Sequence, residues 1–63
     1  MTNEERIAQI KWNIWALNES INHLEDIYHR AKNEDFKQDT RNQITTMENE
    51  KRALYKEWEG LRK

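Results

Sequence analysis

Two histidines are the side chains of this sequence best suited to holding a metal ion or moving protons. Glu19 and Asp26 stand four residues before and three residues after His23, and Glu25 stands four residues before His29. On a helix these spacings bring the side chains onto one face, where ordinary ion pairs form. A helical zinc site instead uses two histidines four residues apart, and the sequence has no such pair. We therefore predict no metal ligand, no cofactor, no catalytic residue and no small-molecule substrate.

A short basic cluster in the second half of the sequence raises the question of nucleic-acid binding. It consists of Lys51, Arg52 and Lys56. Acidic residues interleave with it at Glu48, Glu50, Glu57 and Glu59, and the formal net charge of the chain is −1 at pH 7. Because phosphate binding depends on an excess of positive charge, a solvated helix surface with internal ion pairs is the favoured interpretation.

Trp12 and Trp15 are the residues with the clearest potential for binding another molecule. They fall outside the apolar repeat of their helix, on its far face, and tryptophan is enriched among the residues that dominate protein interfaces. We predict a partner-binding patch made of Trp12 and Trp15, with Lys11 and Glu19 beside them. The patch faces either another protein or a second copy of this chain, and the sequence leaves both open.

The composition indicates which elements position these residues. Charged residues make up 37% of the 63 and hydrophobic residues 35%, with one glycine, no proline and no cysteine. That profile is typical of long, solvated helices. The apolar runs are too short for a membrane span or a signal peptide, and the missing cysteines fit a reducing compartment such as the cytoplasm.

An apolar heptad repeat runs through the first half of the sequence. Its members are separated by alternating steps of three and four residues, which is the spacing of a helical seam. They are Ile7, Ile10, Ile14, Leu17, Ile21, Leu24, Tyr28 and Ala31. A second repeat follows at Ile44, Met47, Lys51, Leu54, Trp58 and Leu61. The frame of the second repeat is displaced by two residues from that of the first, which matches neither a stutter nor a stammer of a continuous coiled coil.

The charges around the frame shift predict a turn. Arg30 and Lys32 suit the end of a helix, whereas Glu34 and Asp35 suit the start of one, and Asn33 between them suits either kind of cap. We predict one domain, residues 1–63, all-α, an antiparallel hairpin of two helices over about 3–31 and 35–61. A single long helix is the alternative, because no proline or glycine forces the break.

Further expectations follow from the hairpin. Thr2-x-x-Glu5 is the pattern of a capping box at the start of the first helix. Antiparallel pairing would set Ile14 near Leu54 and Ile21 near Met47, while Lys37 and Thr40 would face Tyr28 and Ala31 beside the turn. Phe36 is placed to cover that end. Tyr55 and Trp58 are expected to belong to the core.

The hairpin is predicted to be incomplete on its own. One core in so short a chain supplies little stability, and Ile27 and Tyr55 widen the apolar stripe beyond a two-helix seam. We predict a homodimer in which two hairpins form a four-helix bundle, with the seam residues of both repeats contributing to self-association. Lys51 and Asn18 would then fix the register. The favoured alternative is that Lys51 extends its ammonium group to water.

In length and layout the chain resembles the Rop class of plasmid copy-number regulators. The shared features are two helices of nearly equal length joined by a tight turn, the opening Met1-Thr2 and the capping Glu5. The resemblance implies an antiparallel four-helix bundle that binds paired RNA loops through one helical face. No RNA-binding residue is carried over to this chain.

These observations favour a small, non-enzymatic, cytoplasmic interaction protein. We expect a homodimeric helical bundle that binds another protein and regulates it as an inhibitor or adaptor, with no membrane contact. One alternative is a Rop-like RNA-binding dimer, or another nucleic-acid-binding regulator. The other is a structural segment of a coiled-coil assembly.

Overall fold

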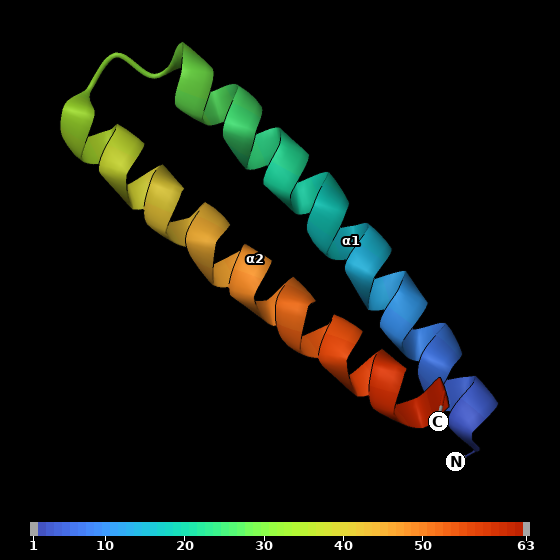
Figure 1. The fold of residues 1–63 in the computed structure, drawn as a ribbon. Coiled ribbons are helices and arrows are strands. Elements are labelled where there is room, and N and C mark those ends of the chain that lie inside the picture. The colour runs from blue at the N-terminus through green and yellow to red at the C-terminus, as the bar shows by residue number, and fades with distance from the viewer. Residues whose placement is uncertain (1, 63) are drawn as a thin grey trace.

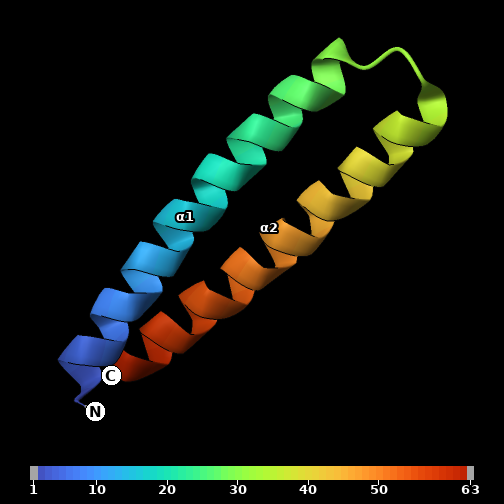
Figure 2. The same cartoon turned by 180° about the vertical axis from the view of Figure 1, so that it is seen from behind.

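A computed structural model of the chain describes residues 2–62, so Met1 and Lys63 lie outside the described range. Two helices, α1 (Asn3–Arg30) and α2 (Glu34–Arg62), run antiparallel along their whole length. The hairpin measures 46 × 15 × 14 Å, with both ends of the chain at one tip and the turn at the other (Figures 1 and 2). The predicted hairpin is confirmed, its helix ends lie within one residue of those predicted, and the single long helix is wrong.

Thr2 caps the start of α1, as predicted. Its hydroxyl oxygen accepts a 3.1 Å hydrogen bond from the Glu5 amide, which has no partner within the helix, and the hydroxyl donates 3.2 Å to the Glu5 carboxylate. The Thr2 carbonyl accepts the first hydrogen bond of the helix, 3.0 Å, from the Arg6 amide. Glu4 and Glu5 place negative charge in the first turn, where the helix dipole favours it.

Asn33 begins α2. Helix α1 ends at Arg30, and Ala31 turns into an extended conformation while its amide still donates 2.9 Å to the Ile27 carbonyl. Two residues later the Asn33 side-chain oxygen accepts a 3.0 Å hydrogen bond from the Phe36 amide. This is N-cap geometry, so of the two caps predicted for Asn33 it forms the one at the start of the second helix. Ala31, predicted as the last residue of the first helix, lies just beyond it.

The core is narrow. Ile10, Ile14 and Ile21 are its buried apolar side chains, and Ile10 has no exposed surface. Thr40 is also buried, with its hydroxyl donating 2.9 Å to the Phe36 carbonyl, so burial leaves no polar atom unpaired there. The remaining seam residues are half-buried: Ile7, Leu17, Leu24, Tyr28, Ile44, Met47, Lys51, Leu54, Trp58 and Leu61. A single pair of helices therefore leaves much of the apolar seam in contact with solvent.

The register of the two helices follows the predicted pairing. The Lys51 ammonium donates 2.8 Å to the Asn18 side-chain oxygen, midway between the predicted pairs Ile14–Leu54 and Ile21–Met47. Near the turn, the Lys37 ammonium lies 5.6 Å from the centre of the Tyr28 ring, as the facing of these residues predicted. Phe36 is 50% exposed, so the expectation that it covers this end of the core is wrong.

Candidate protein-binding surface

A stacked pair of tryptophans stands on the outer side of α1. The ring centres of Trp12 and Trp15 are 5.0 Å apart and their planes are inclined by 21°. Trp12 is 64% exposed and Trp15 is 54% exposed, so the helix face predicted from the heptad frame is the one they occupy. Stacking holds each indole against the other, which limits its rotamers before any partner arrives.

A second aromatic pair lies on α2. Tyr55 and Trp58 stack with ring centres 6.2 Å apart and planes inclined by 12°. Trp58 is half-buried, but Tyr55 is 44% exposed, so the prediction that both belong to the core is wrong for Tyr55. Tyr55 flanks the seam, and a flanking side chain is covered only when a further helix packs on that side.

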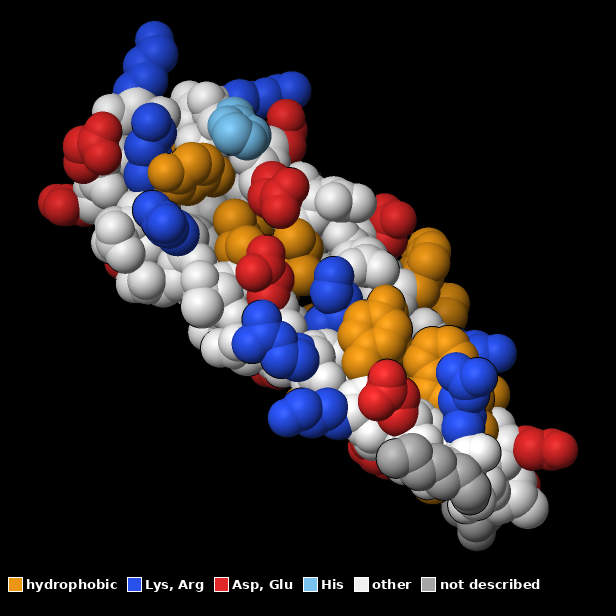
Figure 3. Space-filling model, viewed as in Figure 1, with side chains coloured by type: hydrophobic (Ala, Val, Ile, Leu, Met, Phe, Trp, Pro, Cys, Tyr) orange, Lys and Arg blue, Asp and Glu red, His pale blue; other side chains and the backbone are white. Residues whose placement is uncertain are grey.

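Lys11 reaches from α1 to the second pair. Its ammonium lies 5.4 Å from the centre of the Trp58 ring. A cation over an indole face is attracted by the electron density of the ring. The two stacked pairs, Trp12–Trp15 and Tyr55–Trp58, are together called the aromatic cluster, and Lys11 of α1 contacts its α2 pair. Figure 3 shows apolar side chains at the surface toward the end of the hairpin that holds the termini, with charged side chains around them.

Glu19 is the fourth residue predicted for the patch. It is exposed and lies four residues after Trp15 and seven after Trp12, on the same face of α1, where it also lines a shallow hollow with Ser20 and His23. The structure therefore leaves Glu19 on the tryptophan face of α1 and places Lys11 against Trp58. Tyr55 and Trp58 are the members that the sequence did not assign to this surface, although the position of Tyr55 beside the seam was a usable signal.

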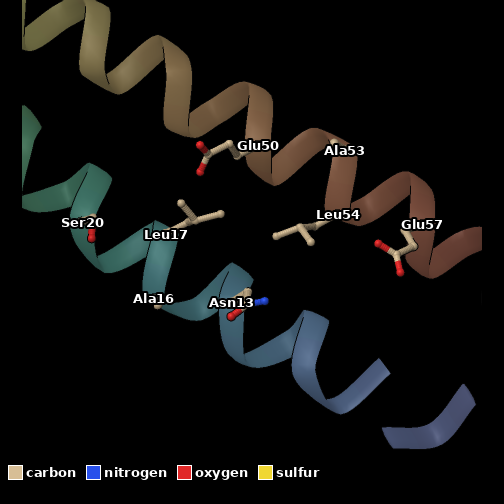
Figure 4. A pocket seen from close by; sticks show the side chains of 8 residues that line it. All are labelled: Asn13, Ala16, Leu17, Ser20, Glu50, Ala53, Leu54 and Glu57. Carbon is tan, nitrogen blue, oxygen red and sulfur yellow. The ribbon is translucent and has the colours of Figure 1, made fainter. Parts of the chain in front are cut away.

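A groove runs along the opposite face of the hairpin. Leu17 and Leu54 extend toward each other between the helices and form its floor, as Figure 4 shows. One section of it has a volume of about 530 Å³. Small side chains edge this section at Ala16, Ser20 and Ala53, and polar ones at Asn13, Glu50 and Glu57. Two adjoining hollows continue the groove toward the turn. One of them shares Ser20 with this section and the other shares Glu50.

An ion pair closes the groove at the end near the termini. The Arg6 guanidinium donates two hydrogen bonds to the Glu57 carboxylate, of 2.5 Å from Nε and 2.8 Å from Nη2. The hydrogen bond from Arg6 lowers the pKa of Glu57, with a smaller contribution from the opposite charge. The same contact raises the pKa of Arg6. Both side chains are partly exposed, so the pair fixes geometry more than it stabilises the fold.

The candidate chemical groups stay dispersed. His23 lies beside Glu19 at the hollow, whereas His29 packs edge-on against Tyr28 with ring centres 5.7 Å apart. Within residues 2–62, no three histidine or acidic side chains gather as a metal site would need. Neither α1 nor α2 contains, in its described residues, an apolar stretch sufficient to cross a bilayer.

Comparison with protein-family models, curated proteins and solved structures gives no match to this chain. The surface geometry is therefore the basis on which function is assigned.

Proposed function

We propose that this protein is a small, non-enzymatic, cytoplasmic interaction protein, a homodimeric helical bundle that binds another protein through the aromatic cluster and regulates it. The observation that carries the proposal is the exposed, stacked pair Trp12–Trp15. Large indole surfaces left in water are uncommon on proteins that act alone, and tryptophan is prominent in the centres of interfaces.

The construction of the cluster supports this role. Stacked aromatic rings offer broad apolar area with few rotatable bonds, so little conformational freedom is lost when a partner covers them. Lys11 adds a positive charge over the Trp58 ring, and Lys51 and Arg52 line a hollow together with Tyr55 and Glu48. A partner with apolar side chains and acidic residues at its rim would match both features.

The shape of the molecule supports regulation by occupying a surface. A rod 46 Å long and about 15 Å thick offers long helical faces on which side chains keep fixed positions. A protein of this kind acts by covering a site on its partner or by bridging two partners. Inhibitor and adaptor are the two forms of this role.

The proposal is tested by capture from a native lysate with the intact protein as bait. Trp12→Ala combined with Trp15→Ala should reduce capture of the specific partner by about tenfold or more, because these positions would form the centre of the interface. The matched control is Phe36→Ala, which removes another exposed aromatic ring at the opposite tip. Circular dichroism verifies that each variant keeps its helices.

Three results would contradict the proposal or a part of it. Unchanged capture by the folded double tryptophan variant would remove the aromatic cluster as the binding surface. Recovery of RNA whose binding weakens steeply with added salt would instead favour the nucleic-acid alternative. Sedimentation equilibrium tests the homodimer, which a monomer at every concentration would exclude.

A further inference from the structure

We infer that the groove floored by Leu17 and Leu54 is the self-association surface, and that its occupant is a second copy of this chain, related by a twofold axis parallel to the hairpin. The inference rests on the proposed homodimer and specifies its interface. It leaves the aromatic cluster free for a different protein.

The hairpin exposes more surface than a compact monomer of its mass, by about the area that one partner buries in a dimer. Its accessible surface is 5119 Å² for a mass of 7.8 kDa. A compact monomer of this mass exposes about 4,400 Å², so the hairpin exposes about 700 Å² in excess. A standard protein interface covers about 800 Å² on each partner, close to that excess.

The dimensions lead to the same conclusion. The radius of gyration is 14.6 Å. A compact chain of this length would have about 11 Å, and one twice as long about 14 Å. A second hairpin packed alongside the first would make the rod thicker without making it longer. A pair of hairpins is therefore the smallest assembly with the proportions of a globular protein.

The groove is suited to receiving a helix. Leu17 and Leu54 supply apolar contact at its floor, and the small side chains of Ala16, Ser20 and Ala53 allow another helix to approach closely. The groove continues through the adjoining hollows over roughly half the length of each helix, from Asn13 to Leu24 and from Asn42 to Glu57.

The polar residues of the groove select the direction of the twofold axis. Asn18 and Lys51 lie at one level of the hairpin, because they are hydrogen-bonded. Counting from them, Ser20 lies level with Glu50, and Asn13 level with Glu57. With the axis parallel to the hairpin, α1 of each copy packs on α2 of the other. Each glutamate then faces a hydrogen-bond donor, Ser20 opposite Glu50 and Asn13 opposite Glu57.

An axis across the hairpin is disfavoured by the same residues. It would pack α2 on α2 and bring Glu50 toward glutamates of the second copy, whereas the charge of Glu57 is already paired with Arg6. Like charges at such close range oppose association. The parallel axis also sets Ala16 of each copy against Ala53 of the other.

The first test adds one acidic side chain to the groove. Ala53 is exposed in the single hairpin, so Ala53→Glu can fold as a hairpin but would place bulk and negative charge inside the interface. We expect its dimer dissociation constant, from sedimentation equilibrium, to rise about tenfold or more. The matched control is Ala8→Glu, the same change at an exposed alanine on the tryptophan side of α1, and it should leave dimerisation intact.

The second test measures the axis directly. The chain contains no cysteine, so one introduced thiol per chain reports one position. Mixing Ala16→Cys chains with Ala53→Cys chains under mild oxidation should give mixed disulfide dimers in excess over like-with-like dimers. An excess of like-with-like dimers would overturn the parallel axis.

The outcomes separate this inference from the proposed function. A dimer that persists in Ala53→Glu overturns the groove as the interface while leaving the homodimer in place. A monomer at every concentration overturns both the interface and the homodimer. Loss of partner capture in the double tryptophan variant concerns the aromatic cluster alone. It bears neither on the groove as the interface nor on the homodimer.

Discussion

The ammonium group of Lys51 donates a 2.8 Å hydrogen bond to the side-chain oxygen of Asn18, joining the seam of α2 to the flank of α1. Both residues are half-buried, so Lys51 is held against the other helix and does not simply extend to water. The alternative favoured from the sequence, that Lys51 only solvates its charge, is therefore wrong. A polar pair inside an apolar seam penalises any shift of one helix along the other, because a shift leaves both groups unpaired.

The Asn18–Lys51 pair should be measurable as a coupling energy. Asn18→Ala leaves the partly buried ammonium without its acceptor and should lower the free energy of unfolding by about 1 kcal/mol. Lys51→Met removes the charge and keeps the length of the side chain, so adding it to Asn18→Ala should recover most of that loss. Urea unfolding of the wild type, both single variants and the double variant gives the coupling. Additive effects would mean that the hydrogen bond contributes nothing.

Asn33 supplies a second prediction, on the turn. Asn33→Ala removes the side-chain oxygen that accepts from the Phe36 amide and should cost about 1 kcal/mol of unfolding free energy. Asn49→Ala is the matched control, because Asn49 is exposed inside α2, where alanine is the better helix former. Thermal unfolding of the two variants should move in opposite directions. Equal effects would contradict the capping role.

The Arg6–Glu57 pair predicts a pH dependence. Because hydrogen bonding by Arg6 lowers the pKa of Glu57 in the folded state, the pair's contribution to stability is present above the ordinary glutamate pKa of about 4.3. It is lost as the pH falls through the lower pKa of the folded protein. NMR titration should show the Glu57 carboxyl titrating below its ordinary range, and returning toward it in Arg6→Gln.

The control for this titration is Arg41→Gln, which neutralises another exposed arginine and changes the net charge equally. It should leave the Glu57 midpoint near its wild-type position. A Glu57 midpoint that does not move in Arg6→Gln would show that the pair is not populated in solution.

The hairpin could be predicted from the sequence because its signals are local. The frame shift between the repeats, the charges around Asn33 and the Thr2–Glu5 box each act within a few residues, and the structure confirms the hairpin they specify. Contacts between the helices depend on small rotations that a repeat does not encode. The Arg6–Glu57 pair and the exposure of Tyr55 belong to this second class.

The candidate surface was predictable only in part for the same reason. A heptad frame assigns Trp12 and Trp15 to the outer face of one helix, and the structure places them there. The frame does not say which residues of the other helix come beside that face. Lys11 and Trp58 are brought together by the antiparallel register of the two helices.

The last prediction uses the tryptophans as reporters of which surface the second copy covers. In Trp58→Phe, fluorescence comes from Trp12 and Trp15 alone, and both are exposed in the hairpin. If the groove is the interface, acrylamide quenching of this variant should be equally efficient above and below the dimer dissociation constant. Quenching should be weaker in Trp12→Phe combined with Trp15→Phe, where the half-buried Trp58 is the single emitter. A fall in quenching of Trp12 and Trp15 on dimerisation would instead put the aromatic cluster inside the dimer.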